Sequence, residues 1–394
     1  MIVPDLDVDA ARAATPGCAA GAFLLSAGSS LPTQTTLDAV VGHLRREADV
    51  GGYRAADEAH DVLQRGRADL AALVGGEPSE IAFVPSDSVG WVKAWWGWVV
   101  GGNVPDGGVV LVDRLTYHSH YAALVQTQTI AHFEIRVMPS LPDGTVDLAA
   151  LDVPNEISVV CATMVGTHCG NVNPIAEIGA AAAGVPLFVD GCQAVGQLEI
   201  DVHTLGCHVL TGTGRKFLRG PRGSGVLWIA TELVDRFQPP GIDATSTDWT
   251  AEGGLSTRPG IGRFEEYEVS YAAMVGLASA AHQARTIGMA AIEARVTGLA
   301  ETLREALGRI DDVTVHDTAA RKCGIVTFTV ACAEPGTVVD VADRHGISIN
   351  ASTAPWAALD MDAKGLGSVV RASPHYFNTE SELERLVDVV DQIR

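Results

Sequence analysis

Several features that this 394-residue sequence lacks exclude whole classes of protein. No apolar run approaches the roughly 20 residues of a membrane-spanning helix, and the first residues, MIVPDLDVDAARAA, contain no basic segment followed by an apolar one. We therefore expect a cytoplasmic protein without a membrane partner. The seven cysteines are scattered and form no CxxC pair, so the sequence indicates neither a disulfide framework nor a zinc site.

Basic residues are also scarce, because 27 Lys and Arg face 48 Asp and Glu and give a formal net charge of −21. Such a chain repels phosphate backbones, so we expect no nucleic-acid partner. No GxGxxG motif opens a helix after the first predicted strand, which makes a dinucleotide-binding or non-catalytic α/β protein the remote alternative. We find no internal repeat and no low-complexity tract.

The composition that remains is typical of a folded enzyme, with 47% hydrophobic and 19% charged residues. Apolar residues at helical spacing predict helices over 34–47 and 55–74. Continuous apolar runs then alternate with helical patterns, which is typical of an α/β protein whose mainly parallel sheet is covered on both faces. The runs are 81–84, 109–113, 157–165, 185–190, 207–212 and 225–230.

The chain is long enough for two domains. Residues 239–262 are rich in Gly, Pro, Ser and Thr and predict a long loop between them. A helical region over 271–307, strand-like stretches and a closing helix at 380–393 then predict an α+β unit. We expect an N-terminal segment (1–30), a large domain (31–255) and a small C-terminal domain (256–394).

Lys216, in TGTGRKFLRGPRG, lies about 20 residues after the segment PLFVDGCQAVGQ, in which an apolar run ends at Asp190. This layout suits a lysine that holds pyridoxal phosphate as a Schiff base, with an acid against the pyridinium nitrogen of the cofactor. Thr213 and Arg215 supply a hydroxyl and a guanidinium for the phosphate. Taken alone, Asp190 suits a helix cap and Lys216 a surface position, and the pairing of the two favours the cofactor site.

The segment IAFVPSDSVGW reads as a strand, a polar turn and the start of a helix. The backbone amides of Asp87, Ser88 and Val89 would form an anion site for the cofactor phosphate at that helix N-terminus. A plain helix cap is the alternative.

Four further side chains follow predicted strands. Tyr117 is placed to stack on the cofactor ring. Metal ligation by His118 and His120 is a weak alternative, because no carboxylate or thiol completes a set at suitable spacing, and we expect no metal. Arg371 is a candidate clamp for a substrate carboxylate, although a single arginine is more often part of an ordinary ion pair.

These segments together resemble the class V aminotransferase family of fold-type I pyridoxal phosphate enzymes, and the resemblance covers nearly the whole chain. It rests on the motifs FVPSDSVG, VDGCQAVGQ, TGTGRKFLRGPRGSGVLW and VRASPHYFNTESELERLV. The resemblance implies a large domain with a mainly parallel seven-stranded sheet and a homodimer with shared active sites. It also implies that Asp190 pairs with the pyridinium nitrogen, Gln193 lies near the ring hydroxyl, and Thr213, Arg215 and the Ser88 turn hold the phosphate.

Some details narrow the resemblance. Cysteine desulfurases carry a nucleophilic cysteine shortly before the carboxylate-binding arginine, and NASTAPWAALDMDAKGLGSVVR has none. Thr167 stands in GTHCG where many relatives have an asparagine over the cofactor. Together with Thr167, the segments READVGGYRAADEA and GRKFLRGPRG make the chain similar to the hercynylcysteine sulfoxide lyases, the carbon–sulfur lyases of ergothioneine biosynthesis. The chain is also similar to enzymes that act on cysteine S-conjugates.

The substrate portion beyond the cysteine is expected to meet Tyr53 and Glu268. Glu268 lies in RFEEYEVS, where many relatives have a Gly-Thr pair, so it is expected to face a cationic part of the substrate or an arginine. Further aromatic residues of this pocket, expected to be built by two subunits, are Trp249, Tyr267 and Trp356.

The resulting hypothesis is β-elimination on an S-substituted cysteine or its sulfoxide, a small amino-acid substrate. Lys216 would remove the α-proton, the sulfur group would leave, and pyruvate and ammonia would follow. Aminotransfer, epimerisation, and decarboxylation coupled to oxidative deamination begin from the same bound state and remain open alternatives.

Overall fold

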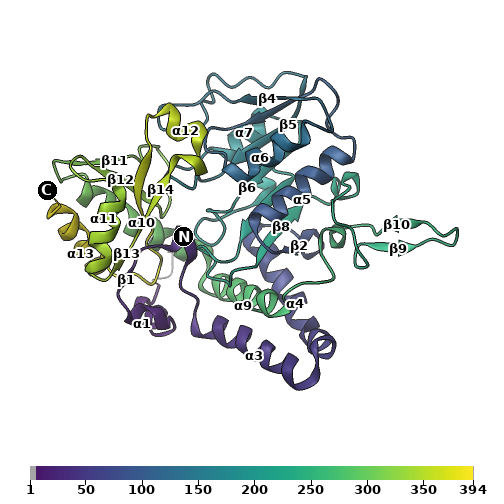
Figure 1. The fold of residues 1–394 in the computed structure, drawn as a ribbon, viewed down its shortest axis with the longest axis horizontal. Helices are drawn as coiled ribbons and strands as arrows, with labels where there is room; N and C mark the ends of the chain where they lie inside the picture. Colours follow the sequence, from purple (N-terminus) through teal and green to yellow (C-terminus); the bar gives the residue numbers. More distant parts are fainter. Residues whose placement is uncertain (1–5, 394) are drawn as a thin grey trace.

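The chain forms two lobes in a computed structural model that describes residues 6–393 (Figure 1). The predicted N-terminal segment (1–30) thus begins, and the small domain (256–394) ends, outside the described residues. None of the described helices combines the length and apolar character needed to cross a membrane.

The large lobe is built on a seven-stranded sheet with the order β2-β8-β7-β6-β5-β3-β4. Only β8 runs against its neighbours, and the other adjacent strands pair in parallel. The mainly parallel sheet is therefore confirmed. Its strands are β2 (Ile81–Val84), β3 (Val109–Val112), β4 (Glu134–Val137), β5 (Ile157–Thr163), β6 (Leu187–Asp190), β7 (Val209–Thr213) and β8 (Gly225–Ile229).

Helices cover both faces of this sheet, as the continuous apolar runs predict. Val110 and Val112 of β3 pack in the same core as α5 and α6, whereas Val109 and Leu111 pack with α4, α7 and α9. Alternate residues of one strand therefore reach opposite cores. The helices of this lobe are α3 (Gln34–Val50), α4 (Gly52–Val74), α5 (Asp87–Val100), α6 (His118–Thr127), α7 (Ile175–Ala181), α8 (Val202–Leu205) and α9 (Tyr271–Ile287).

The small lobe is an antiparallel sheet, β11-β12-β15-β14, packed with helices. The N-terminal segment joins it, because β1 pairs in parallel with β13. Its elements are β1 (Ala22–Phe23), α10 (Met289–Leu307), β11 (Val313–Val315), β12 (Val326–Val330), α11 (Pro335–Arg344), β13 (Ile347–Ser348), β14 (Asn350–Thr353), α12 (Ala358–Ala363), β15 (Ser368–Ala372) and α13 (Glu380–Asp391). Shorter elements are α1 (Val8–Ala13), α2 (Ser26–Ser29), η1 (Pro16–Ala19), η2 (Pro78–Glu80), η3 (Val234–Arg236), η4 (Ile261–Phe264) and η5 (Ala354–Trp356).

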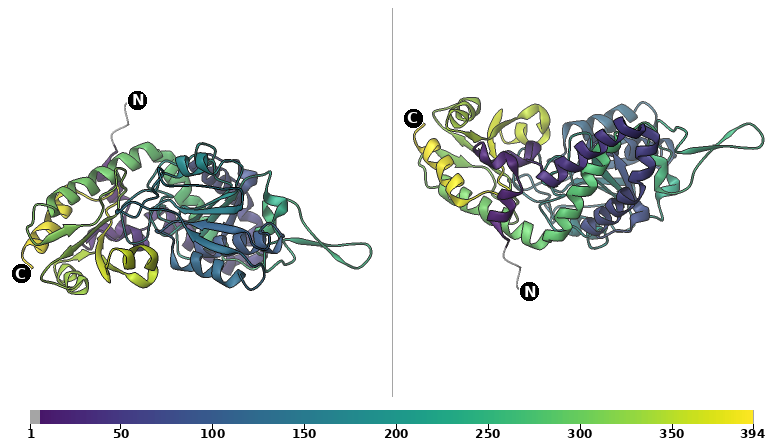
Figure 2. Two further views of the ribbon diagram at one scale, coloured as in Figure 1. Left: turned by 90° about the horizontal axis from the view of Figure 1, so that it is seen from above. Right: turned by 90° about the horizontal axis from the view of Figure 1, so that it is seen from below.

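Two predicted elements differ from the structure. The helical region over 271–307 is two helices, because Gly288 has a φ of 94° and separates α9 from α10. The loop predicted over 239–262 contains a hairpin of β9 (Thr247–Trp249) and β10 (Leu255–Thr257). Figures 1 and 2 show this hairpin projecting from the large lobe. Within it, Trp249 pairs with Leu255 and is 79% exposed.

Candidate active site

Lys216 and Asp190 meet at the carboxyl edge of the large sheet. Asp190 ends β6, Lys216 follows the adjacent strand β7, and both are buried. The Nζ of Lys216 donates a hydrogen bond to the Sγ of Cys192 at 3.0 Å, and the backbone N–H of Cys192 donates to Oδ1 of Asp190 at 2.8 Å. The sequence-predicted pair is therefore brought together, with a cysteine between them.

His120 lies behind Asp190 and joins it to a second carboxylate. Its Nδ1 is 3.2 Å from Oδ2 of Asp190, and its Nε2 forms a hydrogen bond of 2.9 Å with Oδ2 of Asp87. Thr211 donates to the other oxygen of Asp87 at 2.7 Å, and Trp91 stacks on the imidazole with 4.3 Å between ring centroids. His120 therefore has two carboxylate partners that its sequence neighbourhood does not show, because both come from distant parts of the sequence.

The Asp87–His120–Asp190 cluster is electrostatically coupled. Burial alone opposes a charge on His120, yet Asp190 and Asp87 raise the pKa of His120 to about 10. Burial likewise opposes the charge on Asp87, but His120 and Thr211 hold the pKa of Asp87 below its usual range. The ligand atoms of the three residues lie within 4.8 Å of one another, and their direct contacts account for this spacing without a metal ion.

The N-terminus of α5 differs in one respect from the predicted anion site. Ser86 caps the helix, and its hydroxyl accepts a hydrogen bond from the Val89 N–H at 3.2 Å. The plain cap thus accounts for Val89, and the backbone amides of Asp87 and Ser88 remain as the candidate anion-binding pair at this end. Thr213, at the end of β7, is buried at the same edge of the sheet.

Two arginines face the site without a carboxylate partner among residues 6–393. Arg371, from β15 of the small lobe, is buried and donates to the carbonyl and hydroxyl oxygens of Thr167. Arg215 donates to the carbonyl oxygen of Gly28. Burial and the nearby Arg215 lower the pKa of Arg371 to about 10, and its Nε is buried without a partner. Two neighbouring cations of this kind call for an anionic ligand.

Gln193 and Tyr117 complete the predicted set. Gln193 donates to the carbonyl of Ala27 at 3.2 Å and to the Thr167 hydroxyl at 3.4 Å, and its Oε1 is buried without a partner. Tyr117 is half-buried, packs edge-on against His120, and stacks with Trp356 at 6.1 Å between ring centroids. Both residues therefore lie with Thr167 and His120 at the junction of the lobes.

The loop after Lys216 is held in place by Arg219, which has a φ of 65° although it is not glycine. Its guanidinium donates to Thr15, to the carbonyl of Leu31 and to the hydroxyl of Tyr376. These bonds tie the loop to both the N-terminal segment and the small lobe, which offsets the strained backbone.

Tyr53 and Glu268 are not brought to this cluster within one chain. They line a separate groove of about 600 Å³ together with Tyr267, and neither Lys216 nor Asp190 contributes to its walls. Trp249 lies apart from this groove on the projecting hairpin. Of the four expected substrate-pocket aromatics, only Trp356 reaches the cluster, through its stacking on Tyr117.

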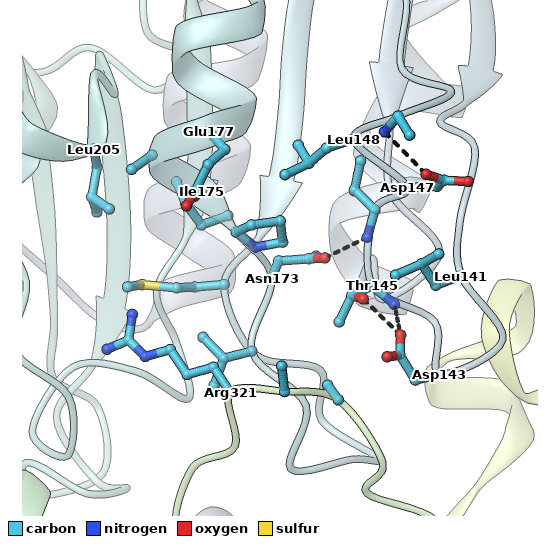
Figure 3. A pocket seen from close by; sticks show the side chains of 18 residues that line it. Leu141, Asp143, Thr145, Asp147, Leu148, Asn173, Ile175, Glu177, Leu205 and Arg321 are labelled. Carbon is cyan, nitrogen blue, oxygen red and sulfur yellow. Dashed lines mark hydrogen bonds between the residues drawn. The ribbon is translucent and has the colours of Figure 1, made fainter.

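A second cavity, of about 620 Å³, is lined by none of the predicted site residues (Figure 3). Asp143 accepts hydrogen bonds from the backbone and hydroxyl of Thr145, and Asn173 accepts one from the backbone of Val146, so these two polar groups already have partners. The predicted catalytic residues, Lys216 and Asp190, lie outside this cavity.

Comparisons with known proteins agree with this geometry. Residues 22–386 match the family model described as aminotransferase class-V. A probable hercynylcysteine sulfoxide lyase of Mycobacterium tuberculosis is 30% identical over 96% of this chain and 91% of its own length. A probable cysteine desulfurase of Xylella fastidiosa is also 30% identical, over 86% of this chain and 81% of its own.

Solved structures share the fold over almost the whole chain. The apo cysteine desulfurase of Thermococcus onnurineus superposes with a TM-score of 0.90 at 23% identity, covering 100% of this chain and 99% of that one. A cystine C–S lyase in complex with cysteine persulfide gives a TM-score of 0.84 at 21% identity, covering 96% and 99%.

Proposed function

This chain belongs to the aminotransferase class-V family of pyridoxal phosphate enzymes, and we propose that it cleaves the carbon–sulfur bond of an S-substituted cysteine or its sulfoxide. The products are a thiol or sulfenate, pyruvate and ammonia. The observation that carries the proposal is the convergence of Lys216, Asp190 and the unpaired Arg371 on one site. The similarity to the hercynylcysteine sulfoxide lyase, over 96% of this chain, supports it.

The residues of the site fit pyridoxal phosphate. Bound cofactor supplies an electron sink for the bonds around the substrate α-carbon. Lys216 would hold it covalently, Asp190 would face its ring nitrogen, and the buried unpaired oxygen of Gln193 marks room for a polar group of the ring. Thr213, Arg215 and the amides of Asp87 and Ser88 would hold its phosphate.

Three side chains of this protein would perform the elimination. Lys216 Nζ, once freed, takes the α-proton of the substrate, and no carboxylate within the described structure pairs with it. Arg371 binds the substrate carboxylate and so fixes the orientation of the α-carbon. Thr167, which already contacts both Arg371 and Gln193, links the carboxylate site to the cofactor site.

Sulfur transfer through a persulfide is disfavoured. The stretch from Asn350 to Arg371 contains no cysteine. Cys192 contacts Lys216, but burial raises the pKa of its thiol, and a protonated thiol is a poor nucleophile. Sulfur would therefore leave with its substituent.

The test is a panel of S-substituted cysteines and their sulfoxides, incubated with the purified yellow enzyme and assayed for pyruvate. Lys216→Ala, which cannot form the Schiff base with the cofactor and should release no pyruvate, is the control for the role of the lysine. Carbon dioxide release with sulfur retained in the product would favour oxidative decarboxylation and contradict the lyase. A wild-type protein that stays colourless after added pyridoxal phosphate would contradict every reaction of this class.

The active site is proposed to be shared in a homodimer, because Tyr53 and Glu268 lie in a groove of their own. Mixing inactive Lys216→Ala with a defective Tyr53→Phe/Glu268→Gln variant tests this sharing. Mixed dimers would contain one site with every group intact, so about a quarter of wild-type activity should return. No recovery, with dimers demonstrated by exchange, would contradict the shared site.

A further inference from the structure

The position of His120 between two buried carboxylates has no role in the elimination described above. We propose that His120 is a positioning residue: its imidazolium, held from behind by Asp87, orients the Asp190 carboxylate and maintains its negative charge toward the cofactor ring nitrogen. This inference rests on the proposed role of Asp190 against that nitrogen.

The first argument is geometric. Both oxygens of Asp190 have a partner in the protein. Oδ1 accepts a hydrogen bond from the Cys192 backbone, and Oδ2 makes a charge contact with Nδ1 of His120 at 3.2 Å. On the far side, Asp87 is itself fixed by Thr211. The order Thr211, Asp87, His120, Asp190 therefore links β7 through α5 and α6 to β6. This row of contacts fixes the Asp190 carboxylate in one orientation, in the way that residues hydrogen-bonded to a metal ligand orient that ligand.

The second argument is burial. His120 is 1% exposed, Asp87 is 2% and Asp190 is 4% exposed, and Trp91 covers one face of the imidazole. A buried charge requires a partner, because removing it from water costs several kcal/mol. A neutral His120 would leave two buried carboxylates on either side of one ring without a compensating charge.

The third argument is the charge balance. Two carboxylates and one imidazolium leave one net negative charge, which a protonated ring nitrogen would neutralise. Other groups facing the cluster are Asp113, Tyr117, Cys192 and Lys216. Burial raises the pKa of Asp113 to about 7, so above that pH Asp113 adds a negative charge and cannot supply the positive charge that the two carboxylates need. Burial also raises the pKa of Tyr117 and Cys192, so these two groups stay neutral. The high pKa of His120, about 10, is consistent with this balance.

A simpler role for His120 is to partner Asp87 alone, because only the Asp87 contact has hydrogen-bond geometry and Nδ1 is otherwise unpartnered. The two roles differ in what the cofactor experiences. If His120 only partners Asp87, replacing His120 leaves the protonation of the cofactor ring nitrogen unchanged. If His120 positions Asp190, replacing it changes that protonation.

The experiment uses nitrogen-15 NMR on the full-length holoenzyme, with labelled histidine and, separately, cofactor labelled at the ring nitrogen. In the wild type, both nitrogens of His120 should be protonated from pH 6 to 9, and the ring nitrogen should be protonated too. In His120→Gln the Asp190 carboxylate, which has lost its neighbouring cation, should take the proton that it shares with the ring nitrogen, so the ring nitrogen should be unprotonated at pH 8. The cofactor should then dissociate about tenfold more readily. His118→Gln, an exposed neighbour on the same helix, is the matched control.

A neutral His120 in the wild type at pH 8 would overturn the inference, even if the variant did not fold. So would a folded His120→Gln variant whose ring nitrogen stays protonated and whose cofactor affinity is unchanged. If the ring nitrogen shifts as expected but no cysteine conjugate yields pyruvate, the role of His120 stands and the lyase proposal fails.

Discussion

The Nζ of Lys216 lies 3.0 Å from the Sγ of Cys192, and this thiol is the hydrogen-bond partner that the structure gives it. A thiol is a weak acceptor, so the contact orients the lysine without pairing its charge. Cys192 therefore positions Lys216 within the site and leaves it available for the cofactor and the substrate.

Cys192→Ala should keep the yellow colour and retain activity within about tenfold of the wild type. The reason is that burial raises the pKa of the thiol, so the thiol carries no nucleophilic step. Steady-state pyruvate formation and the absorbance of the bound cofactor measure both effects. A loss of more than a hundredfold with cofactor still bound would instead indicate that Cys192 accepts sulfur.

Arg371→Gln should lower kcat/KM for cysteine conjugates about ten- to a hundredfold, mostly through KM. A charged hydrogen-bond pair with the substrate carboxylate contributes about 1.5–3 kcal/mol. Arg309→Gln, at an exposed position after α10, serves as the control. An unchanged KM in the Arg371 variant would show that the substrate carboxylate binds elsewhere.

Asp360→Asn should destabilise the protein by about 3–5 kcal/mol, because it leaves the partly buried Arg114 and Lys364 without their counter-charge. The Asp360 carboxylate is fully buried and contacts Arg114, His168 and Lys364 at 2.7 Å each. Although burial opposes it, His168 and Lys364 hold the pKa of Asp360 below its usual range.

Urea unfolding at pH 7 measures how far Asp360→Asn lowers the free energy of unfolding. Asp362→Asn is the matched control, because it changes an exposed carboxylate of the same helix. Equal stability of the two variants would contradict the structural role of Asp360.

Asp113 should make the protein less stable as the pH rises from about 4 to 7. Burial raises its pKa to about 7, although the amides of Thr163 and Leu115 oppose this, so the folded state binds a proton that the unfolded state releases near pH 4. The contribution is present at low pH and is lost as the pH passes through the folded pKa.

Between pH 5 and 8, this group alone should reduce the free energy of unfolding by about 3 kcal/mol. Asp113→Asn cannot titrate, so its unfolding free energy should fall less over the same interval. Identical pH dependence in both proteins would show that Asp113 is ionised in the folded state.

The core of the site was predictable because it follows from strand order. Asp190 and Lys216 each come after an apolar run, and the carboxyl ends of parallel strands meet at one edge. The position of His120 between two carboxylates was not predictable, because its partners Asp87 and Asp190 are 33 and 70 positions away in the sequence and only the fold brings them together. The contact between Cys192 and Lys216 likewise requires the packing of β6 beside β7.

The elements that sequence patterns missed are short or interrupted. Apolar spacing continues through Gly288, so the two helices read as one. Strands β9 and β10 have three residues each, too few to show alternation among the surrounding Gly, Ser and Thr. Strand β4, EIRV, is at the exposed edge of the sheet and is too polar to resemble the buried runs.

The central claim, carbon–sulfur β-elimination, is tested most directly by the stoichiometry of a single S-substituted cysteine consumed by the purified enzyme. The account predicts that each substrate consumed yields one pyruvate, one ammonia and one thiol, with no carbon dioxide and no persulfide on the protein. Alanine accompanied by a protein-bound persulfide, or a decarboxylated product that keeps its sulfur, would contradict it.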